Sequence, residues 1–271
     1  AVSALYIPNA LNEYKRVSEV LTKLRRYDLV PWYYIEDRTR RTIEKRGQSS
    51  VQEYLTDTGR WLFDSRSYGR CYVQNQPVYV EVIIEKDALS SLVEDVLYPY
   101  CTRLSIGRGQ LSASMTEQIA SRCDKSMMQG LTPILLYMGD LDPSGVAIPQ
   151  SLKKNLYEHH SLDVEVRRIA LSPEQVKAYK LPETVDAAKK TDSNYKAWLK
   201  VYGNQAPVEL DALHPRDLKA LVKNALEDVY DMSAFNKEME KEAEERQLLK
   251  RIQADVQQFL KQQYPQEFAL L

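Results

Sequence analysis

The sequence has few cysteines and histidines, and neither residue type forms a recognisable ligand pattern. The three cysteines, Cys71, Cys101 and Cys123, contain no CxxC pair and cannot all pair with one another. This argues against both a disulfide scaffold and a cysteine-based zinc site, and a reducing cytoplasm is the expected location. Two of the three histidines, His159 and His160, end a lysine-rich helical segment, where we expect surface side chains.

Two further absences concern membranes and net charge. No apolar run approaches the roughly 20 residues needed to cross a bilayer, and no charged and apolar leader opens the chain. We therefore expect a soluble protein without membrane contact. The net charge is −1, from 37 basic and 38 acidic residues, so any affinity for nucleic acid must come from a local excess of positive charge.

Such an excess is present in residues 1–46, with ten basic against six acidic side chains. Apolar side chains recur at three- and four-residue steps in residues 11–26, which predicts an amphipathic helix. This helix can be a solvated surface element, or it can belong to a truncated winged-helix module in residues 1–70 that lies against DNA phosphates. The candidate phosphate contacts are Lys15, Arg16, Lys23 and Arg26.

The central part of the chain, residues 71–215, alternates between strand and helix patterns. The β-branched and apolar residues 78–84 lead into a helix, and residues 102–106 lead through a glycine turn into a second helix. The apolar run ILLYMG leads through a sharp polar turn into a third helix, and residues 164–170 predict a further strand. This alternation predicts an α/β domain, a Rossmann-like parallel sheet with flanking helices.

The C-terminal region, residues 216–271, is helical in pattern to its end. Residues 236–262 are rich in Glu, Lys, Gln and Leu and contain few helix breakers. Such a segment fits either a solvated helix or a dimerisation arm, and we expect a homodimer.

Three acidic residues follow predicted strands: Glu85 closes the first strand, and Asp140 and Asp142 follow the run ILLYMG. Because the carboxyl ends of parallel strands meet at one edge of the sheet, we expect these residues to be neighbours. Clustered carboxylate oxygens favour Mg²⁺, which retains waters and a substrate phosphate in its shell. The alternative interpretation is that DLDPSG is only a polar turn and that Glu85 caps a helix.

A second acidic pair, Glu209 and Asp211, lies in the segment VELDALHP. These residues could contribute carboxylates to a second metal position. The competing interpretation is a polar strand end before a helix that starts at a proline.

Three motifs, in this order, resemble those of the Toprim domain as it occurs in the A subunit of topoisomerase VI and the related meiotic double-strand-break protein. They are Glu85-Lys86-Asp87-Ala88, Gly107-Arg108-Gly109 and Asp140-Leu141-Asp142-Pro143-Ser144-Gly145. The resemblance covers roughly residues 75–170 and is weak in the rest of the chain, while the basic N-terminal segment looks like the tail of the winged-helix module that precedes Toprim in that family.

The resemblance implies roles for the motif residues. Glu85, Asp140 and Asp142 would coordinate Mg²⁺ and be catalytic, with Glu85 also an acid–base group. The glycine-rich turns would let the backbone approach the substrate closely, and two basic side chains would contact DNA. These turn and contact residues are Gly107, Gly109 and Gly145, and Lys86 and Arg108.

The resemblance further implies an enzyme that cleaves double-stranded DNA, associated with the cytoplasmic nucleoid and with an ATPase B-type subunit. That family cuts DNA with a winged-helix tyrosine that lies further from the Toprim glutamate than the 84 residues that precede Glu85 here. Tyr33 and Tyr34 form a pair, but they follow the basic helix. We therefore expect the catalytic tyrosine to lie upstream of Ala1, in a segment missing from this chain.

Two other functions remain open. The first is a metal-dependent hydrolytic Toprim nuclease of a plasmid- or phage-defence type, similar to the nuclease subunit of the Wadjet plasmid-defence system, in which Glu209 and Asp211 would matter more. The second is a non-catalytic DNA-binding protein whose magnesium only organises the fold. Covalent protein–DNA adducts, free DNA ends and metal-insensitive binding would distinguish the three functions.

Overall fold

The computed structural model describes residues 11–31, 34, 54–55, 57–59, 68–107, 109–182, 191–203 and 205–266. The chain divides into two compact units. Cys71–Glu238 form the bulk of one unit, and the other combines Ile7–Arg70 with Met239–Leu271. The predicted winged-helix module in residues 1–70 and Arg108 fall largely or wholly outside the described residues, so both stay predictions.

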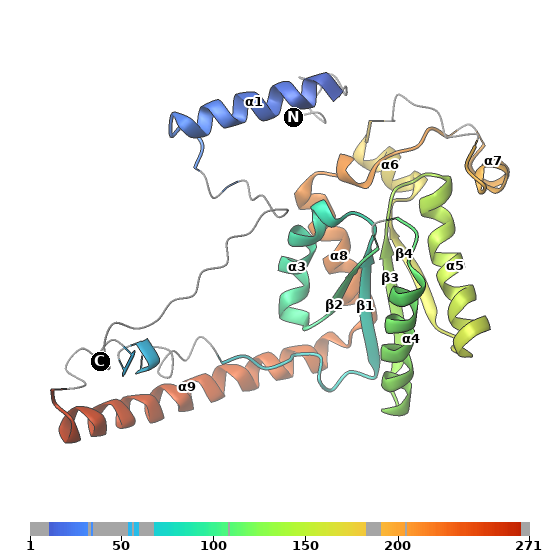
Figure 1. Ribbon diagram of the computed structural model, residues 1–271. Helices are drawn as coiled ribbons and strands as arrows, with labels where there is room; N and C mark the ends of the chain where they lie inside the picture. Colours follow the sequence, from blue (N-terminus) through green and yellow to red (C-terminus); the bar gives the residue numbers. More distant parts are fainter. Residues whose placement is uncertain are drawn as a thin grey trace. The chain divides into compact units, whose positions relative to one another are not determined.

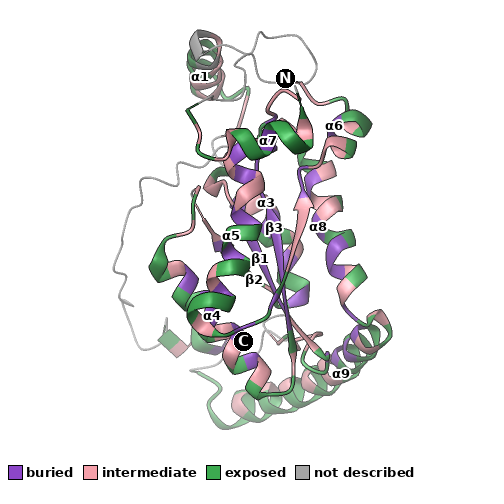
Figure 2. Ribbon diagram, turned by 90° about the vertical axis from the view of Figure 1, so that its right-hand side faces the viewer, coloured by how far each residue is buried: buried purple, intermediate pink, exposed green. Residues whose placement is uncertain are grey.

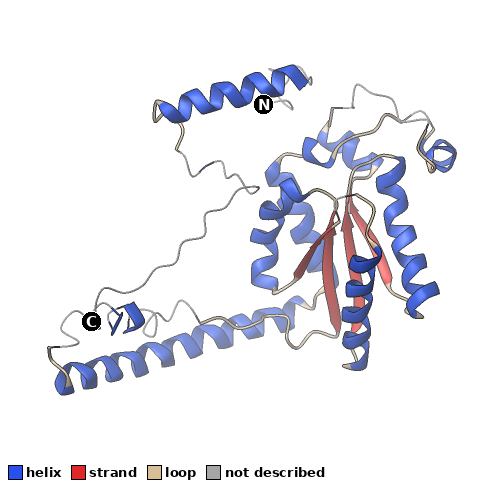
Figure 3. Ribbon diagram, viewed as in Figure 1, coloured by secondary structure: helices blue, strands red, loops and turns tan. Residues whose placement is uncertain are grey.

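The first unit is built around a four-stranded parallel sheet, as Figures 1 and 3 show. Its strands are β1 (Val78–Ile84), β2 (Arg103–Ile106), β3 (Thr132–Met138) and β4 (Glu165–Ala170), in the order β2-β1-β3-β4. Ile84 is paired with Ile106 on one side and Met138 on the other, so β1, β2 and β3 end level with one another. The predicted α/β class and parallel sheet are confirmed.

The strand order creates a reversal of winding direction between β1 and β3. The chain leaves β1 to form β2 on one side and then crosses back to form β3 on the other side. In parallel sheets, ligands bind at the carboxyl ends of strands where the winding reverses. The residues that follow β1 and β3 therefore occupy the favoured place for a site.

Four helices cover the two faces of the sheet. They are α3 (Ser90–Leu97), α4 (Ala113–Met128), α5 (Pro143–His160) and α8 (Pro215–Val229). Val82 packs in the core on the side of α3 and α8, whereas the next residue, Ile83, packs on the side of α4 and α5. In Figure 1, α3 lies to the left of the sheet and α5 lies to its right.

Coverage of both faces explains the sequence pattern of the strands. A strand that is buried on both sides reads as a continuous apolar run rather than an alternating one. The last five residues of β1 and the last six of β3 are buried, and Figure 2 shows both strands mainly in the purple of buried residues.

The remaining helices lie toward the ends of the chain and after β4. They are α1 (Leu11–Arg26), α6 (Pro173–Tyr179), α7 (Tyr195–Tyr202) and α9 (Met232–Gln263), and short 3₁₀ turns cover Asp87–Leu89, Tyr98–Tyr100 and Leu210–Ala212. The helix predicted for residues 11–26 and the helical region predicted after residue 216 are confirmed. Among the described helices, none combines the length and apolar character that a membrane crossing requires.

Candidate functional site

Glu85 and Asp140 meet at the carboxyl edge of the sheet, although 55 positions separate them in the sequence. Glu85 directly follows β1, and its Oε2 atom accepts hydrogen bonds from the backbone N–H of Asp140 and the hydroxyl of Tyr137, both at 3.1 Å. The expected proximity of these two acidic residues is therefore present in the structure. Because one donor is the backbone N–H of Asp140, this hydrogen bond also holds the segment after β3 against the end of β1.

The carboxylate of Asp140 is buried, with 8% of the residue exposed. Its Oδ1 atom accepts a hydrogen bond of 2.7 Å from the backbone N–H of Leu210. The adjacent Leu141 exchanges backbone hydrogen bonds of 2.9 and 3.1 Å with Val208. The segment around residue 209 is thereby attached to residues 139–145, which we call the acidic loop. The buried Asp140 carboxylate regains part of the hydrogen bonding that it lost from water.

Asp142 caps the N-terminus of α5. Its Oδ1 atom accepts a 2.6 Å hydrogen bond from the N–H of Gly145, and Pro143 occupies the first helical position. This pairing of an N-cap aspartate with proline is typical of helix starts. The alternative interpretation of DLDPSG as a polar turn is therefore correct for its local geometry. Asp142 lies in this turn, two positions after Asp140 in the sequence.

Two glycines permit the close approach of these groups. A Cβ atom at Gly139 would lie 2.5 Å from Glu85 Oε2, and a Cβ atom at Gly145 would overlap the carbonyl oxygen of Asp140. A larger residue at Gly139 would displace the side chains of Tyr137 and Glu85, and one at Gly145 would displace the loop backbone. Gly145, predicted from the third motif, is therefore needed for the acidic loop itself.

The second predicted turn follows β2. The N–H of Gly107 donates a 2.8 Å hydrogen bond to the carbonyl of Ile84, so this turn starts beside Glu85. Gly109 has a φ angle of +92°, a backbone conformation that favours glycine. Both residues lie at the same edge of the sheet as the acidic residues.

Lys86 brings Glu209 and Asp211 to the site. Its Nζ atom lies 3.4 Å from Asp140 Oδ1 and 3.5 Å from Asp211 Oδ1, and it also forms an ion pair with Glu209. The second acidic pair of the sequence analysis is therefore next to Asp140. In this structure the Lys86 ammonium, predicted to contact DNA, interacts with three carboxylates.

Burial controls the protonation of the acidic residues. Loss of solvent raises the pKa of Asp140 to about 7, despite the opposing effects of the Leu210 N–H and the Lys86 charge. Burial also raises the pKa values of Glu85 and Asp142. Burial would lower the pKa of Lys86, but its hydrogen bond to Glu209 and the charges of the neighbouring aspartates raise it overall.

The donor set fits a magnesium ion in its chemistry, because it consists of carboxylate oxygens whose mutual repulsion a divalent cation relieves. Within the described residues, however, no three Asp, Glu, His or Cys side chains are gathered tightly enough to hold an ion in their present rotamers. Lys86 supplies the positive charge beside Asp140, Glu209 and Asp211 instead.

Two further residues at this site carry no functional pattern in the sequence. Arg168 on β4 donates hydrogen bonds to the backbone of the acidic loop, and its only signal was an Arg-Arg pair inside a predicted strand. Asp192 accepts a 2.5 Å hydrogen bond from the Ser144 hydroxyl, and after burial its charge is the main neighbouring charge that raises the pKa of Asp142. No local pattern marked Asp192.

The four candidate DNA contacts of the N-terminal segment, Lys15, Arg16, Lys23 and Arg26, are all exposed on α1. Arg16 also forms an ion pair of 3.1 Å with Glu13 on the same helix. Their exposure makes these side chains accessible to a phosphate backbone.

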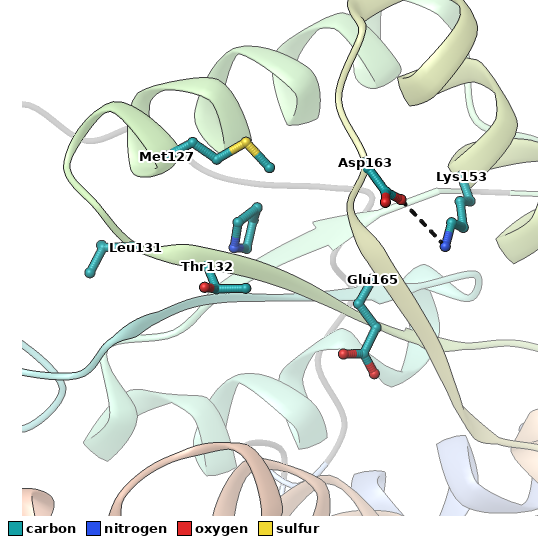
Figure 4. A pocket seen from close by; sticks show the side chains of 7 residues that line it. Met127, Leu131, Thr132, Lys153, Asp163 and Glu165 are labelled. Atoms are coloured by element: carbon teal, nitrogen blue, oxygen red, sulfur yellow. Dashed lines mark ion pairs between the residues drawn. The ribbon is translucent and has the colours of Figure 1, made fainter.

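A separate cavity of about 350 Å³ lies at the opposite end of the sheet, where β3 and β4 begin (Figure 4). It contains the ion pair of Lys153 and Asp163, with Glu165 and Thr132 nearby. Its lining residues precede or open the strands, whereas Glu85 and Asp140 follow them. This cavity is therefore not part of the acidic site.

Comparisons with known proteins do not assign this chain to a family. No protein-family model matches it, and a search of curated proteins returned no matching sequence.

Proposed function

We propose that this chain contains a Toprim-type magnesium site that acts on the phosphodiester backbone of double-stranded DNA, in a protein similar to the A subunit of topoisomerase VI. The hydrogen bond from the Asp140 N–H to Glu85 Oε2, at the carboxyl ends of β1 and β3, is the observation that carries the proposal. It joins the first and third of the Toprim-like motifs at the place where a parallel sheet binds ligands.

Glu85, Asp140 and Asp142 would hold the magnesium ion, which stabilises negative charge on a phosphate during transfer. Glu85 is suited to exchange a proton with the reacting oxygen, because burial raises its pKa. The turn at Gly107 and Gly109 would let the backbone approach the DNA strand.

The basic residues would bind DNA phosphates. Lys15, Arg16, Lys23 and Arg26 would do so from a winged-helix module, and Lys86 and Arg108 from the first and second Toprim-like motifs. Strand cleavage would be a transesterification by a tyrosine, in a cytoplasmic, nucleoid-associated homodimer that works with an ATPase B-type subunit.

A second candidate function is a hydrolytic Toprim nuclease. The observation that favours it is the contact of Lys86 with Asp140, Glu209 and Asp211, which brings two more carboxylates beside the proposed magnesium ligands. Additional carboxylates could bind a second ion and orient an attacking water, as in two-metal sites.

The first test is titration calorimetry with Mg²⁺ on the wild type and the variants Asp140→Ala and Asp142→Ala. The proposal expects weaker binding in both variants and unchanged binding in Asp163→Ala, whose carboxylate lies in the cavity at the opposite end of the sheet. Equal affinity in the wild type and both site variants would rule out the site.

The second test follows labelled supercoiled DNA incubated with the purified chain and Mg²⁺. We expect metal-supported binding without a covalent tyrosyl–DNA adduct, because Tyr6, Tyr33 and Tyr34 do not occupy the place of the nucleophile in the pattern that the chain resembles. Free DNA ends would instead support the hydrolytic nuclease. Tight DNA binding whose affinity does not depend on Mg²⁺ would support a non-catalytic DNA-binding protein. An adduct that disappears in Tyr6→Phe, Tyr33→Phe or Tyr34→Phe would show that the nucleophile lies within the chain.

A further inference from the structure

Arg168 is the polar side chain of β4 that points at the acidic loop. Its guanidinium donates four hydrogen bonds, and all of them end on backbone carbonyl oxygens. The acceptors are Leu171 at 2.9 Å, Gly145 at 2.7 Å, Gly139 at 2.9 Å and Asp140 at 2.6 Å. Three of these four acceptors lie in residues 139–145, which span the loop after β3 and the first turn of α5.

Each proposed magnesium ligand depends on a residue that Arg168 contacts. The carbonyl of Asp140 accepts a hydrogen bond from Arg168, and the N–H of Asp140 donates one to Glu85. The carbonyl of Gly145 accepts from Arg168, and its N–H donates to the Asp142 carboxylate. The guanidinium also lies 5.5 Å from the ring centre of Tyr137, whose hydroxyl donates to Glu85.

These contacts distinguish Arg168 from a basic residue that neutralises the acidic site directly. Within the described residues, Arg168 forms no ion pair with a carboxylate, and its side chain is partly buried. A guanidinium presents five N–H donors in a rigid planar fork. That geometry can hold several carbonyls at once, whereas an ammonium group on a flexible stem cannot hold the same set.

We propose that Arg168 is a positioning residue for the acidic site, which holds residues 139–145 through their carbonyls so that Glu85, Asp140 and Asp142 face one metal ion. This inference rests on the proposed function. It assigns to Arg168 a role in metal binding that passes through the loop backbone rather than through contact with the metal or the DNA. Outer residues that orient metal ligands typically contribute roughly 10- to 100-fold to metal affinity.

The experiment compares Arg168→Gln and Arg168→Lys with Arg167→Gln. Arg167 is the matched control, because it is the preceding residue of β4 and its guanidinium pairs with Glu165 at 2.8 Å on an exposed surface. Affinity for Mn²⁺ is measured by electron paramagnetic resonance, and backbone hydrogen exchange is measured for residues 139–145 and for β1.

The expected result is a loss of roughly 10- to 100-fold in Mn²⁺ affinity in Arg168→Gln, with faster exchange at the amides of Asp140 and Gly145 and unchanged protection of β1. Arg168→Lys should restore only part of the affinity, and Arg167→Gln should match the wild type. Hydrogen exchange in β1 reports whether the sheet is intact. If Arg168→Gln is misfolded, the exchange in β1 reveals it, and Arg168→Lys is used in its place.

Two outcomes would overturn the inference. If the loop amides exchange faster in both Arg168 variants but Mn²⁺ affinity equals that of the wild type, Arg168 is only a structural residue. If the wild type binds no Mn²⁺ and Asp140→Ala behaves identically, the proposed function fails and the positioning role fails with it. The two failures are distinguishable because only the second appears in the wild type.

Discussion

In the proposed magnesium site, Lys86 would compete with the divalent cation. Its ammonium lies 3.4 Å from Asp140 and 3.5 Å from Asp211, so an ion that binds Asp140 must displace it or share the site with it. Replacement of Lys86 by Met removes that positive charge from beside the carboxylates. We predict that Lys86→Met binds Mg²⁺ several-fold more tightly than the wild type, measured by calorimetry at low ionic strength.

Lys153→Met is the control for this prediction. Lys153 also pairs with an aspartate, Asp163 at 3.5 Å, but in the cavity at the other end of the sheet. The magnesium affinity of Lys153→Met should equal that of the wild type. A weaker affinity in Lys86→Met than in Lys153→Met would mean that Lys86 supports the site rather than competing with the cation.

The raised pKa of Asp140 predicts a pH-dependent stability in the metal-free protein. Burial raises this pKa to about 7, whereas the pKa of an aspartate in the unfolded chain is about 4. Between these pH values the folded state keeps a proton that the unfolded state has released. The free energy of unfolding should therefore fall as pH rises from about 4 to about 7 in the presence of a chelator.

The variant Asp140→Asn isolates this contribution, since asparagine retains an acceptor oxygen for the Leu210 N–H but has no proton to lose. Urea unfolding at several pH values should show a weaker pH dependence in Asp140→Asn than in the wild type. Asp163→Asn, which changes an exposed carboxylate, should keep the wild-type dependence. Identical curves for Asp140→Asn and the wild type would contradict the prediction.

At the scale of elements, a buried ion pair connects α4 to the sheet. Glu81 on β1 is fully buried and accepts hydrogen bonds from Arg122 of α4 at 2.9 and 2.7 Å, as well as from Tyr79 and Ser105. Removal of one partner leaves a buried charge without its main compensation. We predict that Arg122→Met lowers the free energy of unfolding by about 3–5 kcal/mol, measured by urea denaturation.

Two comparisons make this prediction specific to the buried charge. The double variant Glu81→Met with Arg122→Met should be more stable than Arg122→Met alone, because no uncompensated carboxylate remains. Lys219→Met breaks an exposed pair with Asp95 and should cost less than about 1 kcal/mol. If the double variant is as unstable as Arg122→Met, the loss in free energy of unfolding comes from lost packing rather than from the uncompensated carboxylate.

At the scale of the whole molecule, the nearly balanced charge means that the proposed DNA affinity depends on where the basic residues are exposed. The proposed function assigns much of that affinity to Lys15, Arg16, Lys23 and Arg26 of α1. Each phosphate contact releases counterions, so the logarithm of affinity falls linearly with the logarithm of salt concentration. Replacement of all four by alanine should flatten that slope by roughly 3 to 4 units in a fluorescence-anisotropy titration.

The double variant Lys153→Ala with Lys154→Ala removes two basic residues from α5 and serves as the control. Its slope should stay at the wild-type value, because neither residue is part of the proposed DNA surface. An unchanged slope in the quadruple α1 variant would exclude α1 as the DNA-binding face.

The class of the fold and the places of the main acidic residues followed from local patterns. The apolar runs before Glu85 and Asp140, the first interrupted only by Glu81, predicted strands of a parallel sheet, and the helical spacing after each run predicted crossover helices. Parallel strands end at a common edge, so a shared edge for Glu85 and Asp140 could be predicted from the sequence. Their direct hydrogen bond also required β1 to pair with β3, which the strand order decides. These inferences need only periods of two to four residues and one rule of sheet geometry.

The tertiary structure alone decided which other residues join the acidic site. The order β2-β1-β3-β4 depends on the side of the sheet to which each crossover returns, and no local pattern in the sequence specifies that side. Lys86 meets Glu209 and Asp211 more than a hundred positions away because the Leu141–Val208 bridge attaches that segment to the loop. Arg168 joins the site because β4 pairs with β3, and that pairing is a long-range contact made only when the sheet is complete.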